Sequence, residues 1–338
     1  MVASPSTGPL VLIFGATGAQ GGSVVQHLLE SDKPYRLRAV TRDAAKSAAK
    51  KLAEEGCEVV QADVGNEADL GRVFEGVEVV FAVTDFWSHL SAARELADGK
   101  RLGDAAVKAA TVKRFVWSGL EPVKEISGGK FSRVAHFDSK AAVTAYLRTL
   151  PLPLTVVQPA CYFTNFSGYT PGMAPRLARG SSPSAAMEDK AVEFALPMRA
   201  GARIALIDAR RDYGAFVRAA IEGAESGELL ACAEEKSCED LAREFQDVTG
   251  LPTTYRQLEA DEFLAPFEKD GKGAIGSELL EMLQWFNEYG YYGPKPILPS
   301  QQAVTASRPL QTPYELETWK AWVGEQDWAW LVRGEREA

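Results

Sequence analysis

Hydrophobic and polar positions near the start of the chain follow a strand-then-helix order. Residues 11–14 form an uninterrupted apolar run, which is typical of a strand that is buried on both faces. A glycine-rich stretch follows over residues 15–22, and apolar residues then recur at helical spacing up to residue 29. The pattern therefore predicts a buried strand, a tight turn and a helix over residues 23–29.

The same alternation of apolar runs and helical spacing continues to about residue 160. Because strands that alternate with helices of this length form right-handed parallel crossovers, the sequence predicts an α/β fold with a Rossmann-type, doubly wound parallel sheet. Further strands are expected at residues 35–41, 58–62, 77–83, 114–118 and 154–159, and further helices at residues 44–52, 67–74, 91–110 and 136–150.

The glycines of the first turn have the spacing Gly15-x-x-Gly18-x-x-Gly21. In a strand–turn–helix unit, such glycines allow the tight turn, the approach of a pyrophosphate and the close packing of helix on sheet. The N-terminus of the helix adds free N–H groups and a partial positive charge. We therefore expect a dinucleotide site at this turn.

The end of the second predicted strand indicates which dinucleotide is preferred. An NAD site places an acidic side chain there, whereas this chain has Arg42, with Lys46 about one helical turn further on. Arg42 can pair bidentately with a 2′-phosphate, so NADP(H) is favoured. The neighbouring carboxylate of Asp43 leaves NAD open as an alternative.

In a doubly wound sheet the ligand lies at the carboxyl ends of the strands, near the switch in strand order. That rule places the cofactor site at the ends of the predicted strands and in the loops after them. The expected cofactor-binding residues are Gly15, Thr17, Gly18, Ala19, Gln20, Gly21, Arg42, Lys46, Asp63, Val64, Val83, Thr84, Pro159, Tyr162 and Phe163.

Beyond residue 160 the alternation breaks down, which predicts a smaller mixed α/β C-terminal lobe. We expect an NADP(H)-binding domain over residues 9–160 and a substrate or partner lobe over residues 161–330, closely packed on the first. The expected features of the second lobe are a loop and candidate lid at 168–190, a strand pair at 195–199 and 202–208, strands at 228–232 and 253–257, and helices at 213–221, 238–248, 262–267, 278–289 and 316–323.

Composition and charge limit the class of protein. The chain has 338 residues and a net charge of −9 without a basic stripe, so direct nucleic-acid binding is not expected. No apolar run approaches the roughly 20 residues needed to span a bilayer, and the first nine residues carry no basic signal region. Four scattered cysteines match no zinc or disulfide pattern, so we expect neither. These features favour a cytoplasmic or nuclear protein with no membrane partner.

Six short motifs together resemble the NmrA-like family of atypical short-chain dehydrogenases/reductases, over residues 9 to about 325. Within it, the chain resembles the NmrA-like family domain-containing redox-sensor proteins more than the phenylcoumaran and isoflavone reductases. The resemblance implies NADP(H) held by the glycine turn, Arg42 and Lys46, and a C-terminal lobe that self-associates or binds a partner. The motifs are GATGAQG at 15–21, TRD at 41–43, DFW at 85–87, SGLE at 118–121, AHFDSK at 135–140 and PACYFTN at 159–165.

Superfamily members that reduce carbonyls carry a Tyr-x-x-x-Lys motif on a helix and a serine after the preceding strand. In this chain His136 occupies the tyrosine position, while Lys140 and Ser118 are in place. The i, i+4 spacing puts His136 and Lys140 on one helical face. The resemblance implies that Lys140 holds the nicotinamide ribose, and Tyr162 is a candidate replacement for the missing phenol.

Two hypotheses follow. In the first, the chain is an NADP(H)-dependent redox sensor that acts through a protein partner or a homodimer, and Lys140 and Ser118 only hold the cofactor. In the second, it is an NADPH-dependent reductase of a hydrophobic carbonyl, quinone or enone, and His136 or Lys140 donates the proton, since a histidine is a competent acid near neutral pH. The C-terminal aromatic cluster at residues 285–292 is expected in the core or at an interface, with the wall of an apolar pocket as the alternative.

Overall fold

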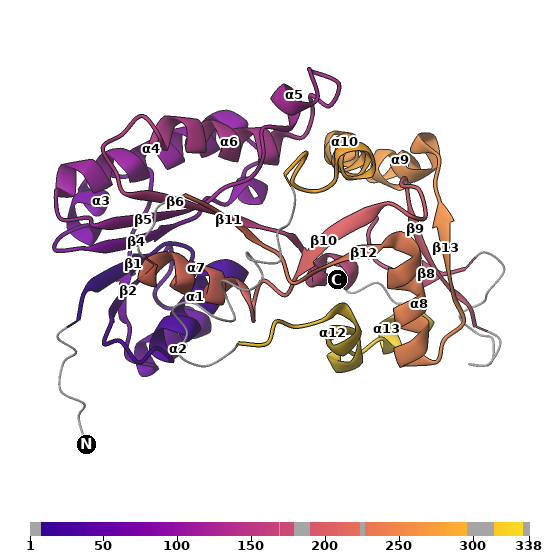
Figure 1. Ribbon diagram of the computed structural model, residues 1–338, viewed down its shortest axis with the longest axis horizontal. Coiled ribbons are helices and arrows are strands. Elements are labelled where there is room, and N and C mark those ends of the chain that lie inside the picture. The colour runs from indigo at the N-terminus through magenta and orange to yellow at the C-terminus, as the bar shows by residue number, and fades with distance from the viewer. Residues whose placement is uncertain (1–7, 169, 179–189, 224–226, 296–313, 334–338) are drawn as a thin grey trace.

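The computed structural model describes residues 8–168, 170–178, 190–223, 227–295 and 314–333. Its larger layer is a seven-stranded parallel sheet in the order β11-β6-β5-β4-β1-β2-β3 (Figure 1). The strands are β1 (Leu10–Ile13), β2 (Arg36–Thr41), β3 (Glu58–Gln61), β4 (Val79–Ala82), β5 (Arg114–Ser118), β6 (Leu154–Pro159) and β11 (Glu228–Ala231). This architecture confirms the predicted doubly wound fold.

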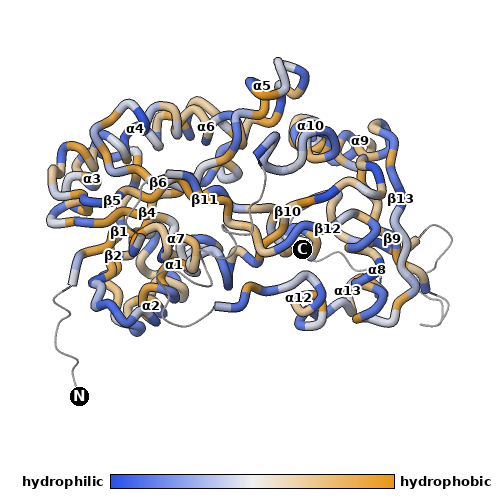
Figure 2. Tube along the Cα trace, in the orientation of Figure 1, coloured by the Kyte–Doolittle hydropathy of each residue, from blue (hydrophilic) through white to orange (hydrophobic). Residues whose placement is uncertain are grey.

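Helices cover both faces of this sheet. Helices α1, α2 and α7 lie on one face, and α3, α4 and α6 lie on the other (Figure 1). Every residue of β1 and β4 is buried, which is why these strands read as unbroken apolar runs (Figure 2). The helices are α1 (Ala19–Leu29), α2 (Ser47–Glu54), α3 (Glu67–Val73), α4 (Ala92–Ala109), α6 (Ala135–Leu147) and α7 (Tyr213–Glu222), with a short α5 (Val123–Ile126) and a 3-10 turn, η1 (Phe86–Ser88).

The chain returns to the large sheet after its first excursion into the smaller lobe. The strand expected at residues 228–232 within that lobe is β11, which pairs in parallel with β6 at the edge of the large sheet. Helix α7 connects to it and packs on α1, where an added Cβ at Gly214 would lie 2.1 Å from the carbonyl oxygen of Ser23. The division expected at residue 160 therefore does not coincide with the edge of this sheet.

The smaller lobe contains two three-stranded sheets, β12-β10-β7 and β13-β9-β8. The strand pair expected at residues 195–199 and 202–208 does not form, because β9 and β10 belong to different sheets: β9 pairs with β13 and β8, and β10 pairs with β12 and β7. The strands are β7 (Cys161–Tyr162), β8 (Arg176–Leu177), β9 (Val192–Leu196), β10 (Arg203–Ile207), β12 (Glu234–Ser237) and β13 (Thr253–Gln257).

The helices of the smaller lobe surround these sheets (Figure 1). One hydrophobic core continues from the α1 face of the large sheet into this lobe and includes Val25, Phe194 and Trp285. Part of the loop expected at residues 168–190 lies outside the described residues. The helices are η2 (Phe163–Phe166), α8 (Cys238–Thr249), α9 (Ala260–Lys269), α10 (Gly273–Tyr289), α12 (Trp319–Glu325) and α13 (Ala329–Arg333). None of the described helices is both long and apolar enough to cross a bilayer.

Candidate functional site

A groove of about 530 Å³ lies at the carboxyl ends of β1 and β4, the two strands between which the chain order reverses. Loops that follow β1, β2, β3, β4 and β6 contribute to its walls, as does helix α10 of the smaller lobe. This is the position where doubly wound sheets bind ligands.

The glycine turn is shaped so that larger residues do not fit. Gly15 has φ +65°, and a Cβ on it would lie 2.9 Å from the Val83 Cγ1 atom. A Cβ on Gly21 would lie 2.3 Å from the carbonyl oxygen of Gly15. Helix α1 consequently begins at Ala19, four residues before the expected start, and its first turn packs directly on the end of β1.

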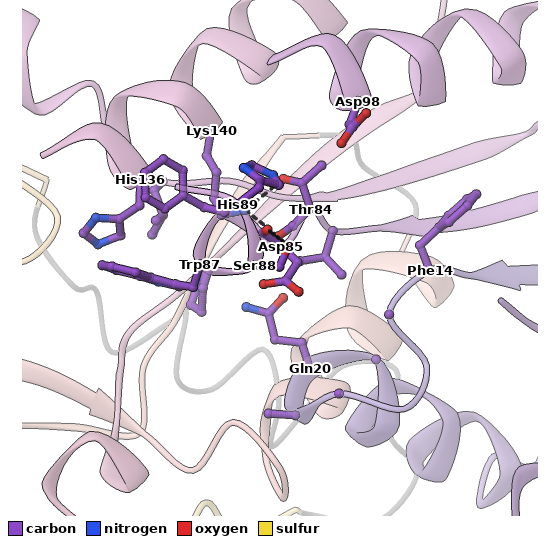
Figure 3. A pocket seen from close by; sticks show the side chains of 18 of the residues that line it. Phe14, Gln20, Thr84, Asp85, Trp87, Ser88, His89, Asp98, His136 and Lys140 are labelled. Carbon is purple, nitrogen blue, oxygen red and sulfur yellow. Dashed lines mark hydrogen bonds between the residues drawn. The ribbon is translucent and has the colours of Figure 1, made fainter. Parts of the chain in front are cut away.

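The first turn of α1 lines the groove, and the first N–H groups of a helix have no acceptor within the helix. Its N-cap is Gly18, no side chain caps it, and its first turn contains no acidic residue. Gln20 is buried beside this turn, and its side chain extends into the pocket (Figure 3). Its Nε2 donates to the Tyr162 hydroxyl at 2.5 Å, and its Oε1 has no partner among the described residues. An anion-binding helix end, close-packed glycines and an unpaired buried amide oxygen fit a dinucleotide.

Two cations lie at the far end of the groove, after β2. Arg42 and Lys46 both line it and are exposed. Arg42 is 3.4 Å from Asp85, but with side-chain exposures of 74% and 59% this pair is weak enough to be replaced by a phosphate. The Asp43 carboxylate accepts the Ala45 N–H at 2.9 Å and so caps its own loop.

At the floor of the groove, Lys140 is part of a buried polar cluster. Its Nζ atom lies 2.7 Å from Glu95 and donates to both the carbonyl and the hydroxyl of Thr84, each at 2.9 Å. Glu95 also accepts from the hydroxyls of Thr84 and Ser139. Burial alone would raise the pKa of Glu95, but the Lys140 ammonium and the three hydrogen bonds hold it below its ordinary value. The Glu95 carboxylate therefore balances the positive charge of the Lys140 ammonium.

His136 lies at the wall of the groove, in the first turn of α6. Its ring centroid is 4.9 Å from that of Trp87, a half-exposed side chain after β4 (Figure 3). Its Nδ1 atom lies 2.7 Å from Oε1 of Glu278, on α10. Glu278 and Glu95 have no local sequence signal, because each meets its partner only in the tertiary fold.

Tyr162 and Cys161 line the groove at the start of the smaller lobe. Burial raises the pKa of the Tyr162 phenol to about 12. Burial likewise raises the pKa of the Cys161 thiol to about 12. Both groups therefore remain protonated at neutral pH; Tyr162 can donate a hydrogen bond, and Cys161 is a poor nucleophile.

Part of the groove wall is apolar, and we call this part the chamber. Its aromatic and aliphatic side chains come from α6, α10, the residues just after α10 and the loop after β4. Two of them, Phe286 and Tyr291, come from the C-terminal aromatic cluster, which thus supplies part of a pocket wall. The chamber residues are Trp87, Phe137, Leu279, Met282, Phe286 and Tyr291.

The structure brings most of the expected site residues to this groove, but not all. Ser118 and Phe163 are completely buried and are not among the groove residues. Phe163 instead packs on Trp319 and Trp322 of α12. The expected residues that line the groove are Gly15, Thr17, Gly18, Ala19, Gln20, Gly21, Arg42, Lys46, Asp63, Val64, Val83, Thr84, His136, Lys140, Pro159 and Tyr162.

Comparison with known proteins extends the description. The sequence model of the NmrA-like family matches residues 7–324. The chain is 29% identical over 262 residues to the NmrA-like family domain-containing oxidoreductase FrzB of a Cladobotryum species, a match that covers 74% of this chain and 76% of that protein.

Two solved structures show the same fold. NmrA, a negative transcriptional regulator solved in complex with NADP, has a TM-score of 0.74 at 19% identity, with 94% of this chain and 95% of that chain covered. The NADPH-dependent quinone oxidoreductase QOR2 of Escherichia coli, complexed with NADPH, has a TM-score of 0.69 at 22% identity, with 93% and 98% covered. At these identities the two structures support the fold and not the activity.

Proposed function

The chain belongs to the NmrA-like family, and we propose that it is an NADPH-dependent reductase of a hydrophobic carbonyl, quinone or enone compound. One observation carries the proposal: the groove that contains the glycine turn also has an apolar chamber, and the His136 imidazole lines the same groove. A protein that only binds a dinucleotide has no need of such a chamber.

The cofactor is NADP(H), held by residues of the groove. The amides at the start of α1 and the glycine turn receive the pyrophosphate, and Arg42 with Lys46 receives the 2′-phosphate. Asp43 is engaged with its own loop and does not compete for the ribose. When bound, NADPH supplies a hydride.

The chain supplies the proton and the environment. His136 is the proton donor, because Lys140 is already bonded to Glu95 and Thr84. Lys140 instead fixes the loop after β4, through the carbonyl of Thr84. The chamber excludes water and selects an apolar acceptor. The names of FrzB, an oxidoreductase, and QOR2, a quinone oxidoreductase, agree with this chemistry.

Titration followed by turnover on one sample tests the proposal. Calorimetry with NADPH and NADH comes first, and then a panel of quinones, aldehydes and enones is monitored by the absorbance of the reduced nicotinamide. We expect NADPH to bind more tightly than NADH, and at least one acceptor to be reduced at a rate that falls in His136→Asn. Tight NADPH binding with no oxidation across the panel would contradict the proposal.

A redox sensor is the second candidate function, favoured by the Lys140–Glu95 pair. In this pair Lys140, the lysine of the family motif, is bonded to Glu95 and is not available as an acid. NmrA, which has the same fold, is a transcriptional regulator. In this case cofactor binding alone would change the surface of the smaller lobe toward a protein partner or a second copy of the chain, in the cytoplasm or nucleus. Binding without turnover in the experiment above would support it.

A further inference from the structure

We infer that Glu278, on helix α10 of the smaller lobe, is a positioning residue that holds His136 as a proton donor, so that the smaller lobe completes the active site. The inference deepens the proposed reductase function and rests on it. Nothing in the motif around His136 predicts this partner, since the two residues are 142 positions apart.

One carboxylate oxygen holds both the backbone and the ring of His136. Oε1 of Glu278 accepts the His136 backbone N–H at 2.8 Å and lies 2.7 Å from its Nδ1 atom. Val134, at the N-cap position of α6, provides no side-chain cap. Glu278 of α10 instead accepts a backbone N–H of the first turn of α6. The two side chains are only 9% and 11% exposed, which protects the pair from screening.

This contact selects the tautomer of the ring. A carboxylate oxygen can only accept, so Nδ1 must carry a proton, and Nε2 is left for the groove. No described residue bonds Nε2. The rings of Trp87, at 4.9 Å, and Phe86, at 6.0 Å, restrict the imidazole plane. His136 is thus fixed in position, plane and tautomer.

The proton balance follows from this arrangement. To donate from Nε2, the imidazole must carry a proton on both nitrogens, and the Glu278 oxygen accepts the Nδ1 proton in that form as well. His136 would give its Nε2 proton to the acceptor oxygen that gains negative charge, and bound NADPH would supply the hydride. The neutral ring keeps the proton on Nδ1, which it donates in the hydrogen bond to Glu278. Nε2 then recovers a proton from water.

Two other contacts of α10 provide matched controls. Glu288 pairs with Lys130 at 2.6 Å, and Glu281 lies 3.6 Å from Arg133. Both join α10 to the segment just before α6, close to where Glu278 contacts the first turn of α6. Lys130 and Arg133 are 55% and 67% exposed, and neither lines the groove. Docking of the lobe can therefore be weakened without a change at His136.

Kinetics of three variants test the positioning role. We expect Glu278→Ala to lower kcat about 100-fold, within the range for general-acid catalysis, with the KM of the acceptor and the Kd of NADPH nearly unchanged. Glu278→Gln retains an accepting oxygen but no charge, so its kcat should lie between those of Glu278→Ala and the wild type. The kcat of Glu288→Gln should match that of the wild type. The solvent deuterium isotope effect on kcat should increase in Glu278→Ala. An unchanged kcat in Glu278→Ala and Glu278→Gln would overturn the inference.

The tautomers of the histidines provide a readout that needs no turnover. The chain has three histidines. His27 Nε2 lies 2.8 Å from the Arg211 carbonyl oxygen and must donate, and His89 Nδ1 accepts the Ser91 N–H, so both carry the proton on Nε2. Nitrogen-15 NMR should therefore show one Nδ1-protonated ring, His136, which loses this preference in Glu278→Ala.

The kinetic and NMR experiments distinguish a failure of the proposed reductase function from a failure of the inference about Glu278. A wild type that shows the Nδ1-protonated ring but reduces no acceptor would contradict the reductase function and leave the Glu278–His136 contact intact. A wild type that turns over while the neutral His136 ring carries its proton on Nε2 alone would overturn the inference and leave the reductase function in place. If Glu278→Ala unfolds, Glu278→Gln supplies both readouts.

Discussion

The Nζ atom of Lys140 lies 2.7 Å from a carboxylate oxygen of Glu95, and the Glu95 side chain is completely buried. The residue that the family motif marks for catalysis is thus bound within the floor of the groove. We expect Lys140→Ala to reduce the free energy of unfolding by about 3–5 kcal/mol, because it leaves a buried charge without a partner.

A double-mutant cycle measured by urea denaturation checks this coupling. Glu95→Ala should have a similar cost, and the double variant should lose clearly less than the sum of the two. Lys113→Ala is the matched control, since Lys113 is 75% exposed in its pair with Glu78 and should cost less than about 1 kcal/mol. If the two lysine variants were equally stable, the buried pair would not hold the floor.

The glycine turn leads to a second prediction. Gly21→Ala should greatly weaken NADPH binding and lower stability, because its Cβ would lie 2.3 Å from the Gly15 carbonyl oxygen and displace the turn. Gly22→Ala is the neighbouring control, with a nearest contact at 3.5 Å. Because it lies within helix α1, this change should stabilise the protein by about 0.5–1 kcal/mol. Calorimetry and thermal unfolding of both variants measure these effects, and equal behaviour would contradict the close packing.

The preference for the phosphorylated dinucleotide depends on Arg42. Arg42→Ala should raise the Kd of NADPH about 10- to 100-fold, the usual value for a lost charged hydrogen bond, and leave the Kd of NADH nearly unchanged. Lys50→Ala, a change at an exposed lysine of α2, the helix that follows the Arg42 loop, controls for net charge. Equal losses for NADPH and NADH in Arg42→Ala would show that the arginine does not contact the 2′-phosphate.

Stability should depend on pH through Asp212, a completely buried residue before α7. Burial raises the pKa of Asp212 to about 7, and its contacts with the Tyr314 hydroxyl and the Glu317 N–H only partly oppose this. The native state therefore binds a proton that the unfolded chain has already released, and stability declines as pH rises from about 4 to about 7.

Asp212→Asn removes the ionisation and tests this slope. Free energies of unfolding for both proteins, measured by urea denaturation at about pH 5 and about pH 8, should show the variant gaining relative to the wild type as pH rises. Parallel pH dependences in the two proteins would exclude Asp212 as the source.

The sequence carries the local parts of this fold clearly. The unbroken apolar run of β1, the glycine spacing and the cations after β2 are each short and chemically distinctive stretches of sequence. The glycine turn and both cations line the groove, which lies at the end of β1. Each of these features is defined by residues that are close in sequence, so periodicity and motif spacing are sufficient to predict it.

The features that the sequence does not predict depend on packing between residues that are far apart in the chain. The strand at residues 228–231 joins the large sheet because α7 packs on α1, a contact that its own pattern does not contain. Phe163 follows a strand whose end faces the ligand, yet its ring packs on Trp319 and Trp322. Glu278 belongs to an apolar helix with no motif, and only the docking of α10 gives it a partner.

Transfer of a labelled hydride tests the central claim most directly. The protein is mixed with an accepted aldehyde or enone and with NADPH deuterated at the transferable position of its nicotinamide ring, and the organic product is analysed by mass spectrometry. For an accepted quinone, the yields of hydroquinone and NADP+ are measured instead, because hydrogens on oxygen exchange with water. We expect the reduced aldehyde or enone to carry one deuterium on carbon and to form more slowly with His136→Asn. Full recovery of NADPH, with no deuterium in any product across the panel, would contradict it and favour the sensor.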